Sequence, residues 1–162
     1  MAEIEITAEP GVPQIIIARE FDASPELLFR AHTEPDLLGQ WLGPEWLTTT
    51  VDYLEPRDGG RWRYTHTDAR GGRHSFHGLY HGDPTPGRIV QTYEFDEQPD
   101  EVYLNTITLE PRGTRTLLRQ NTVFQSVEDR DGYLKAGMEK GVRASMANLD
   151  ALLARVQSQG RG

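Results

Sequence analysis

Histidine is the residue type in this 162-residue chain best suited to metal binding or proton transfer. Four of the five histidines lie between positions 66 and 81. Imidazole binds metal ions and transfers protons near neutral pH. His77 and His81 are four residues apart in a predicted strand, roughly 13 Å, which is too far for one ion. His66 and His74 can approach each other across a hairpin, but no third ligand accompanies them. The pattern therefore predicts neither a metal site nor a metal cofactor.

Other motifs that carry chemistry are missing from the sequence. It has no cysteine, which excludes disulfides, cysteine-ligated zinc and thiol catalysis. It also lacks the Gly-x-Ser-x-Gly, Gly-x-Gly-x-x-Gly and Walker patterns. Acid–base chemistry would have to use single groups in a cavity, and His66, His74 and Tyr80 are the candidates. No catalytic residue and no cofactor is predicted on this basis.

A hairpin over residues 60–82 is predicted to place aromatic side chains on one face. If its turn is centred on DARGG (residues 68–72), Trp62 lies opposite Gly78 and Tyr64 opposite Phe76. Gly78 then leaves room for the indole, or for a ligand beside it. The opposite face is basic and polar, so the aromatic face is expected to point inward. Its members are Trp62, Tyr64, His66, His74, Phe76, Gly78 and Tyr80.

A second hairpin is predicted to turn at residues 111–114, with Glu110 opposite Arg115. This register puts Asn105 opposite Gln120 on an otherwise apolar face. Buried amides are costly unless they are hydrogen-bonded. Either the two amides bond each other or a water molecule, or they offer polar contacts to a bound molecule.

The elements that must position these residues follow one another in a simple order. A strand over residues 14–21 precedes two short helices, with Ser24 and Thr33 as N-caps and Gly43 at the end. Strand and turn patterns then alternate from residue 47 to 125. From about residue 131 to 156 an apolar stripe recurs at helical spacing. We predict an α+β fold in which a curved antiparallel sheet of six or seven strands packs on a long C-terminal helix. The stripe consists of Leu134, Met138, Val142, Ser145, Leu149, Leu152 and Val156.

Two glycines interrupt this predicted helix. Gly137 and Gly141 are one turn apart, beside Met138 and Val142. They cost helix propensity, so a compensating role is expected. Either they let a strand approach closely, or they leave space for a ligand beneath the helix.

Composition and charge narrow the functional classes. Hydrophobic residues make up 36% and charged residues 26%, which is typical of a globular chain. We expect one domain over residues 14–156, an N-terminal extension over 1–13 and a frayed tail over 157–162. A net charge of −8 without a basic block argues against nucleic acid. The longest apolar run is IIIA (15–18), which argues against a membrane span. The acidic N-terminus lacks signal-peptide features, so a cytoplasmic location is expected.

Several separated segments resemble one known family. They are FDASPELLFRAHTEPDLLGQWLGP (21–44), GGRWRY (59–64), FHGLYHGDPTPGRIVQTYEF (76–95) and FQSVEDRDGYLKAGMEKGVRASMANLDALL (124–153). Together they resemble the activator of heat-shock-protein-ninety ATPase homologue family, over about residues 14–156. Two positions depart from the family pattern, because Leu42 and Val142 stand where many members have tryptophan.

The resemblance implies a START-like (SRPBCC) helix-grip fold, in which the sheet wraps around the C-terminal helix and encloses a hydrophobic cavity. The two short helices would close one end of the sheet, with Trp41 under the sheet or at the cavity mouth.

The leading hypothesis is therefore a protein that binds a small apolar or aromatic molecule. Its predicted ligand-binding residues are Trp62, Tyr64, Phe76, Tyr80, Asn105, Gln120, Met138 and Val142. One alternative is a cyclase or hydrolase that acts on an aromatic polyketide-like substrate. The other is a co-chaperone that binds heat-shock protein ninety, although the sequence displays no patch for a protein partner.

Overall fold

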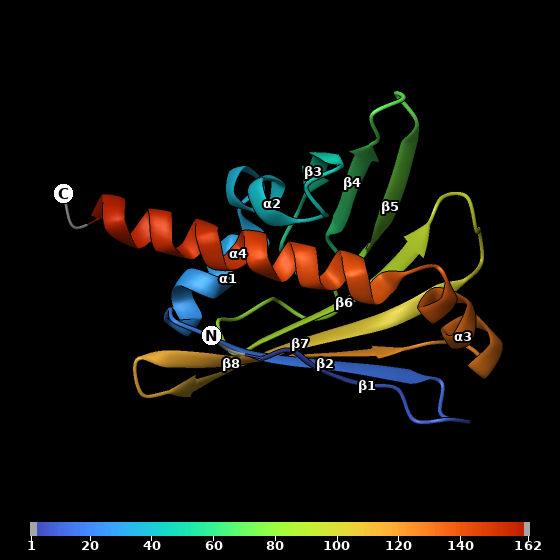
Figure 1. Cartoon of the computed structure of the whole chain (residues 1–162), viewed down its shortest axis with the longest axis horizontal. Coiled ribbons are helices and arrows are strands. Elements are labelled where there is room, and N and C mark those ends of the chain that lie inside the picture. Colours follow the sequence, from blue (N-terminus) through green and yellow to red (C-terminus); the bar gives the residue numbers. More distant parts are fainter. Residues whose placement is uncertain (1–2, 161–162) are drawn as a thin grey trace.

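The computed structural model describes residues 3–160 (Figure 1). It consists of one antiparallel sheet with eight strands, together with four helices. The strands are β1 (Glu5–Thr7), β2 (Gln14–Phe21), β3 (Thr48–Leu54), β4 (Arg61–Thr67), β5 (Arg73–Leu79), β6 (Arg88–Phe95), β7 (Val102–Arg112) and β8 (Arg115–Val123). The helices are α1 (Pro25–Thr33), α2 (Pro35–Trp41), α3 (Val127–Lys135) and α4 (Met138–Gly160). The strand order is β1-β2-β8-β7-β6-β5-β4-β3.

The predicted fold class is confirmed, with one strand more than expected. The additional strand is β1, which pairs with β2 at the edge of the sheet inside the expected N-terminal extension. Its three residues are too few to show an alternating pattern, so the sequence alone did not reveal it. Residues 1–2 of that extension lie outside the described part of the chain.

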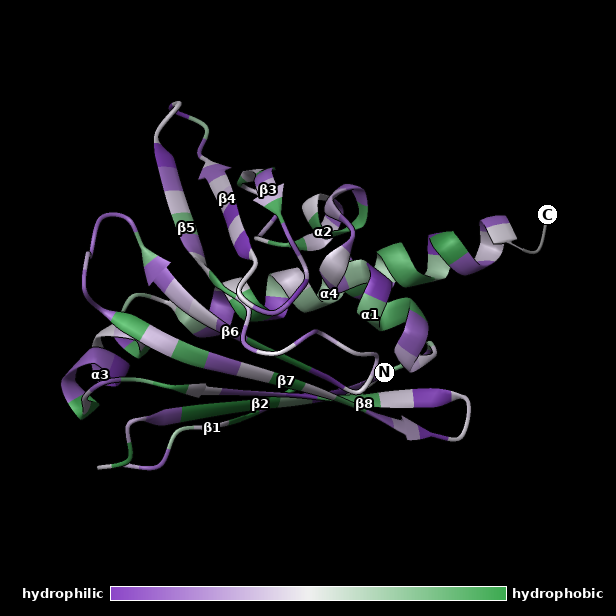
Figure 2. Cartoon of the chain, turned by 180° about the vertical axis from the view of Figure 1, so that it is seen from behind, coloured by the Kyte–Doolittle hydropathy of each residue, from purple (hydrophilic) through white to green (hydrophobic). Residues whose placement is uncertain are grey.

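Helix α4 crosses one face of the sheet, as Figure 1 shows. The side chains of Leu149, Leu152 and Leu153 in its C-terminal half are buried in the main core. Figure 2 shows apolar residues in β2 and along this part of α4, and polar ones toward the tip of β5. Although α4 has 23 residues, no helix within residues 3–160 is both long and apolar enough to cross a membrane.

The predicted C-terminal helix is wrong in its bounds. The chain forms two helices, because Gly137 adopts φ = +89° and ends the first helical segment. That conformation is strained for any residue with a side chain, so Gly137 breaks the helix and does not lie within it. The first of the two helices begins earlier than predicted, at Val127, since the Ser126 hydroxyl accepts a hydrogen bond from the Asp129 amide and caps it.

The far end of α4 also differs from the expectation. Residues 157–160, expected to fray, form the last turn of the helix. The Gln157 side chain donates to the carbonyl of Asp22 and to that of Leu153, which ties this turn to the segment before α1. The remaining residues of the expected tail, 161–162, lie outside the described part of the chain.

Only one of the two short helices begins with the N-cap residue that the sequence predicts. Ser24 caps α1, since its hydroxyl accepts a hydrogen bond from the Leu27 amide. Thr33 does not cap α2, because its hydroxyl donates to the Phe29 carbonyl within α1. Glu34 occupies the N-cap position of α2 without a side-chain bond, and Pro35 supplies the first helical residue.

The register of the β4–β5 hairpin is confirmed, with Trp62 opposite Gly78 and Tyr64 opposite Phe76. The space at Gly78 serves packing. A Cβ atom there would overlap the Thr92 carbonyl of β6 and lie 2.8 Å from Trp62 Cζ2. The glycine therefore admits the indole and the neighbouring strand, and the alternative of ligand space at this position is wrong.

The predicted register of the β7–β8 hairpin is wrong by two residues. Arg112 pairs with Arg115, so that Asn105 lies opposite Thr122 and not opposite Gln120. The loop is shorter than expected because it contains only Gly113 and Thr114. Gly113 has φ = +64°, which suits the first position of a tight type II′ hairpin turn. A shift of two preserves the faces, so Asn105 and Gln120 still point to the same side of the sheet.

Truncation of Leu149 should show how strongly α4 depends on its apolar stripe. Leu149 is fully buried, so Leu149→Ala is expected to lower the free energy of unfolding by about 2–5 kcal/mol in chemical denaturation. Leu104→Ala on β7 is the matched control, since Leu104 is 41% exposed and should change stability by about 0.5 kcal/mol or less. Equal losses in the two variants would contradict the packing of α4 described above.

Candidate functional site

A cavity of about 250 Å³ lies between the sheet and the N-terminal half of α4. Its walls come from both hydrophobic clusters of the core, with Trp62 and Met146 from one cluster and Ile17 and Met138 from the other. All eight residues predicted to bind a ligand border this cavity: Trp62, Tyr64, Phe76, Tyr80, Asn105, Gln120, Met138 and Val142. Contact between these residues and a ligand stays a prediction.

Several lining residues were not anticipated from the sequence. They include Tyr93, Tyr103, Tyr133, Gln91 and His32. Tyr93 lies on β6, whose ladder with β5 has only two paired positions and whose connection to β5 is long, so no tight turn indicated its register. Tyr133 lies on α3, the helix whose bounds were misjudged. The alternation of Ile89, Gln91, Tyr93 and Phe95 was the available indication that β6 contributes to the same face.

The aromatic rings form one continuous wall across the sheet. Trp62 stacks on Tyr64 with their ring centroids 5.5 Å apart, and its indole lies 4.3 Å from the ring of Tyr93. Tyr93 in turn stacks on Tyr103 at 5.4 Å, and Tyr103 meets Tyr133 of α3 edge to face at 5.7 Å. Rings in such offset and edge-to-face contacts stabilise one another and present flat apolar surfaces to a neighbour.

The cavity carries no formal charge at neutral pH, because none of its lining residues is Asp, Glu, Lys or Arg. Burial raises the pKa of Tyr93 to about 12, so its phenol stays protonated. Burial, and to a smaller extent the charge of His74, lowers the pKa of His66 to about 4, so its imidazole stays neutral. Burial also lowers the pKa of His32.

Amide side chains supply the polar part of the sheet wall. Asn105 is buried, and its Oδ1 accepts a hydrogen bond from the Thr122 hydroxyl at 3.1 Å. The two N–H groups of the Asn105 amide, and the side chains of Gln91 and Gln120, make no hydrogen bond to the described residues. These groups can therefore bond to a water molecule or to a ligand in the cavity.

The segment Trp-Leu-Gly-Pro closes one end of the cavity. Trp41 is buried beneath α1, and its indole N–H donates to the Ala31 carbonyl at 2.9 Å. Gly43 has φ = +92°, a conformation that favours glycine. The Gly43 amide donates to Ser145 Oγ at 3.0 Å, and its carbonyl accepts from Asn148 Nδ2 at 3.1 Å. Both groups belong to α4, so this turn fixes the helix relative to α2.

Gly43 also touches the buried histidine of the cavity. A Cβ atom at this position would lie 2.7 Å from His66 Cε1 and 3.0 Å from His66 Nδ1. The same nitrogen, His66 Nδ1, lies 2.8 Å from Thr49 Oγ1. The imidazole is therefore held in one position by a glycine turn and by a threonine on β3.

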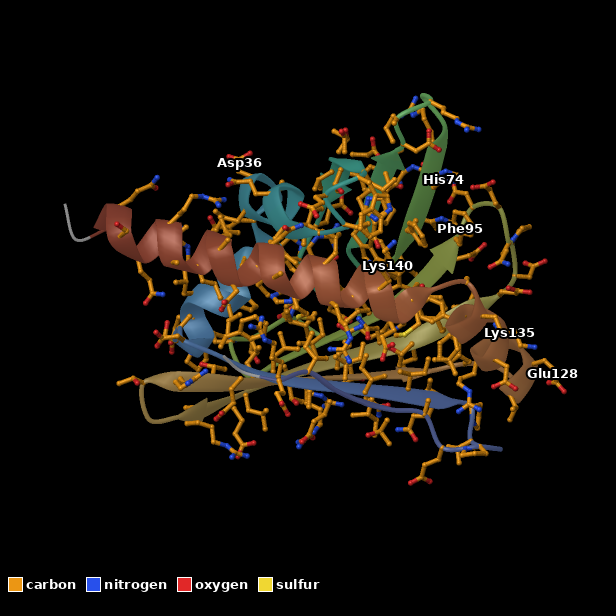
Figure 3. The ribbon with its side chains drawn as sticks, viewed as in Figure 1. Asp36, His74, Phe95, Glu128, Lys135 and Lys140 are labelled. Atoms are coloured by element: carbon orange, nitrogen blue, oxygen red, sulfur yellow. The ribbon has the colours of Figure 1, made fainter. Side chains whose placement is uncertain are left out.

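His74, the other histidine of the hairpin, does not line the cavity. It lies toward the outer end of β5 (Figure 3), with Nδ1 2.9 Å from a Glu97 carboxylate oxygen and Nε2 3.2 Å from an Asp68 oxygen. Of the three candidates for acid–base chemistry, only His66 and Tyr80 border the cavity. Within residues 3–160, no group of three or more His, Cys, Asp and Glu side chains is arranged to hold a metal ion.

A family model and several solved structures match this chain over most of its length. Residues 22–154 match the family model described as Activator of Hsp90 ATPase homolog 1-like protein. A crystal structure of a Rhodobacter sphaeroides protein is similar over 94% of this chain and 99% of its own, with a TM-score of 0.85 and 29% identity. The crystal structure of the AHSA1 protein from Silicibacter pomeroyi is similar over 87% of this chain and 97% of its own, with a TM-score of 0.72 and 25% identity. No curated protein matches the sequence significantly.

The pKa values of the two hairpin histidines should be shifted in opposite directions from the ordinary imidazole value. Hydrogen bonds to Glu97 and Asp68 raise the pKa of His74, so its contribution to stability is full below about pH 6.5 and is lost as the pH rises through the folded-state pKa. For His66, stability should fall as the pH drops from about 6.5 to about 4, because only the unfolded chain gains the proton in that range. Imidazole NMR titration measures both. A His66 that titrates above pH 6 would contradict its buried, neutral state.

Substitution of Gly43 should cost more than substitution of an unconstrained glycine. Gly82 has φ = +78°, and a side-chain carbon there would meet no atom within 4 Å, so Gly82→Ala should cost about 1–2 kcal/mol for the backbone conformation alone. Gly43→Ala adds the collision with His66 and should cost about 1–3 kcal/mol more. Thermal or urea unfolding of both variants measures the difference, and equal losses would mean that the turn is not packed on the histidine.

Proposed function

The chain belongs to the Activator of Hsp90 ATPase homolog 1-like family, and we propose that it binds a small, uncharged, largely aromatic molecule in the cavity beneath α4. The observation that carries the proposal is an aromatic-walled cavity that contains unpaired amide groups and no charged side chain. Sites for small organic molecules commonly combine apolar walls with a few polar groups that set orientation.

The absence of charge among the lining residues supports a neutral ligand. Moving an ion from water into such a site would require a compensating charge, and neither His66 nor Tyr93 is ionised near neutral pH. A neutral aromatic molecule would stack on Trp62 or Tyr64, and Asn105 or Gln120 would bond to its polar substituents. A volume of about 250 Å³ suits a molecule of one or two rings.

A second cavity adjoins the first and supports access from the side of α3. It has a volume of about 330 Å³ and lies between α3 and the segment that joins β6 to β7. Phe76, Tyr103 and Tyr133 border both cavities, so these three rings stand between them. Movement of one ring would join the two spaces and give a ligand a path from the surface.

Proton-transfer catalysis, the enzymatic alternative, has weaker support. It would use His66 and Tyr80, which both line the cavity. A histidine with a pKa of about 4 is a weak base at neutral pH, and burial raises the pKa of Tyr80, which makes it a weak acid. These directions favour binding over proton transfer. The co-chaperone alternative rests on the family name alone.

Tryptophan fluorescence offers a direct test of binding. Trp41 and Trp62 both line the cavity, whereas Trp46 is 49% exposed and contacts Lys140. A Trp46→Phe protein therefore reports from the cavity alone. Neutral aromatic compounds of one or two rings should quench it saturably, with a dissociation constant below about 1 mM.

Gly141 provides a blocking variant and its matched control. It lines the cavity on α4, and a side-chain carbon there would meet no atom within 4 Å. Gly141→Ala should keep binding and stabilise the helix by about 0.5–1 kcal/mol. Gly141→Phe should place a ring in the open space and weaken binding at least about tenfold. If no compound in a broad panel binds the Trp46→Phe protein, the cavity is a structural void and the proposed function is wrong.

A further inference from the structure

The hydrogen bonds around His66 determine which of its ring nitrogens carries the proton. Thr49 has one hydroxyl hydrogen, and the hydroxyl donates it to the Leu42 carbonyl at 2.6 Å. The same oxygen lies 2.8 Å from His66 Nδ1, so it must accept the second hydrogen bond. His66 Nδ1 is therefore the protonated nitrogen. In a neutral imidazole, Nε2 is then left with a lone pair and no hydrogen.

This Nε2 atom makes no hydrogen bond to residues 3–160, and it is not one of the fully buried atoms without a partner, so it is accessible to a water-sized molecule. His66 is 9% exposed and lines the cavity, so the lone pair is an unpaired acceptor in a largely buried side chain. A water molecule, or a hydrogen-bond donor of a ligand in the cavity, can therefore bond to this nitrogen. No cationic side chain borders the cavity to supply one.

We propose that His66 Nε2 accepts a hydrogen bond from a hydroxyl group of the ligand, and that the cavity therefore selects neutral phenols and alcohols over ethers, hydrocarbons and anions. The inference rests on the proposed function and adds the chemical class of its ligand. Thr49 acts as a positioning residue, since it fixes the tautomer without touching the ligand. The Gly43 turn has the same kind of role, because it holds the ring in place.

Amide side chains on two other strands of the sheet complete the pattern. Asn105 has amide N–H groups that make no bond to the described residues, and Gln91 lies beside it in the neighbouring strand. These amides donate to a carbonyl or ether oxygen, whereas the histidine accepts from a hydroxyl. A hydroxylated aromatic ketone would bond both to the amides and to the histidine, whereas a carboxylate would meet the lone pair of His66 without a counter-ion.

Matched two-ring probes test the selection. Isothermal titration calorimetry would compare 2-naphthol with 2-methoxynaphthalene, which has the same ring system but no donor. One neutral hydrogen bond predicts that 2-naphthol binds about 3- to 10-fold more tightly to the wild-type protein. The 2-naphthoate anion should bind more weakly than either neutral probe.

Two variants separate a role in recognition from a role in folding. His66→Phe removes the acceptor and should abolish the preference for 2-naphthol while 2-methoxynaphthalene still binds. Thr49→Val leaves the imidazole in place but removes the partner that fixes its proton, so the preference should shrink. If His66→Phe does not fold, the ¹⁵N resonance of wild-type His66 Nε2 is the deciding measurement. It should have an unprotonated shift and should move on addition of 2-naphthol only.

The outcomes distinguish this inference from the function on which it rests. Equal affinity for 2-naphthol and 2-methoxynaphthalene, or a protonated Nε2 in the free protein, would overturn the role of His66 and leave the binding cavity intact. Failure of both probes, and of the wider panel, would overturn the proposed function and this inference together.

Discussion

Helix α4 packs on the core on both sides of the cavity, and the arrangement of the site depends on these two attachments. Its C-terminal half buries Leu149, Leu152 and Leu153 in the main core. Arg19 of β2 adds a polar contact from below, because its guanidinium donates to the Met146 carbonyl at 3.0 Å and lies 3.6 Å from Asp150. At the start of the helix Met138 packs with Ile15, Ile17 and Phe124 in a second cluster, and the cavity is the space that remains beneath the helix between these two attachments.

The turn at Gly43 supports the same helix from the other side. It bonds to Ser145 and Asn148 of α4, near the middle of the helix, and it contacts His66 of β4. A residue with a side chain could satisfy neither the backbone conformation nor the contact with the ring. Gly43 is therefore required both for its backbone conformation and for its contact with the His66 ring. A helix that sank toward the sheet to fill the cavity would have to break the bonds to this turn, so the turn helps to keep the space open.

The parts of the fold that sequence predicted are those set by local rules. Alternation and a short glycine turn gave the register of β4 and β5, and with it the aromatic face. The error in β7 and β8 came from the turn as well, since Pro111 suggested a longer loop than the two residues present. The predicted faces of β7 and β8 were still correct, because a register shift of two residues leaves each side chain on the same side of the sheet. What could not be predicted was non-local: Tyr93 reaches the cavity through a long connection, and the proton on His66 is set by Thr49 and Leu42, which are distant in sequence.

The polar side chains of the cavity lower the stability of the folded state relative to an apolar core. A core made only for stability would place apolar side chains where Asn105, Gln91 and His66 stand, since polar side chains in a core are unfavourable unless they are hydrogen-bonded. The indole N–H of Trp62 is the one polar atom of the cavity lining that is fully buried with no partner in the described part of the chain. These groups line one cavity, whereas the other fully buried atom without a partner in residues 3–160, Arg19 Nε, lies outside that lining. Local departures from stable packing that gather at one place are expected where a protein binds something, and here they gather beneath the N-terminal half of α4.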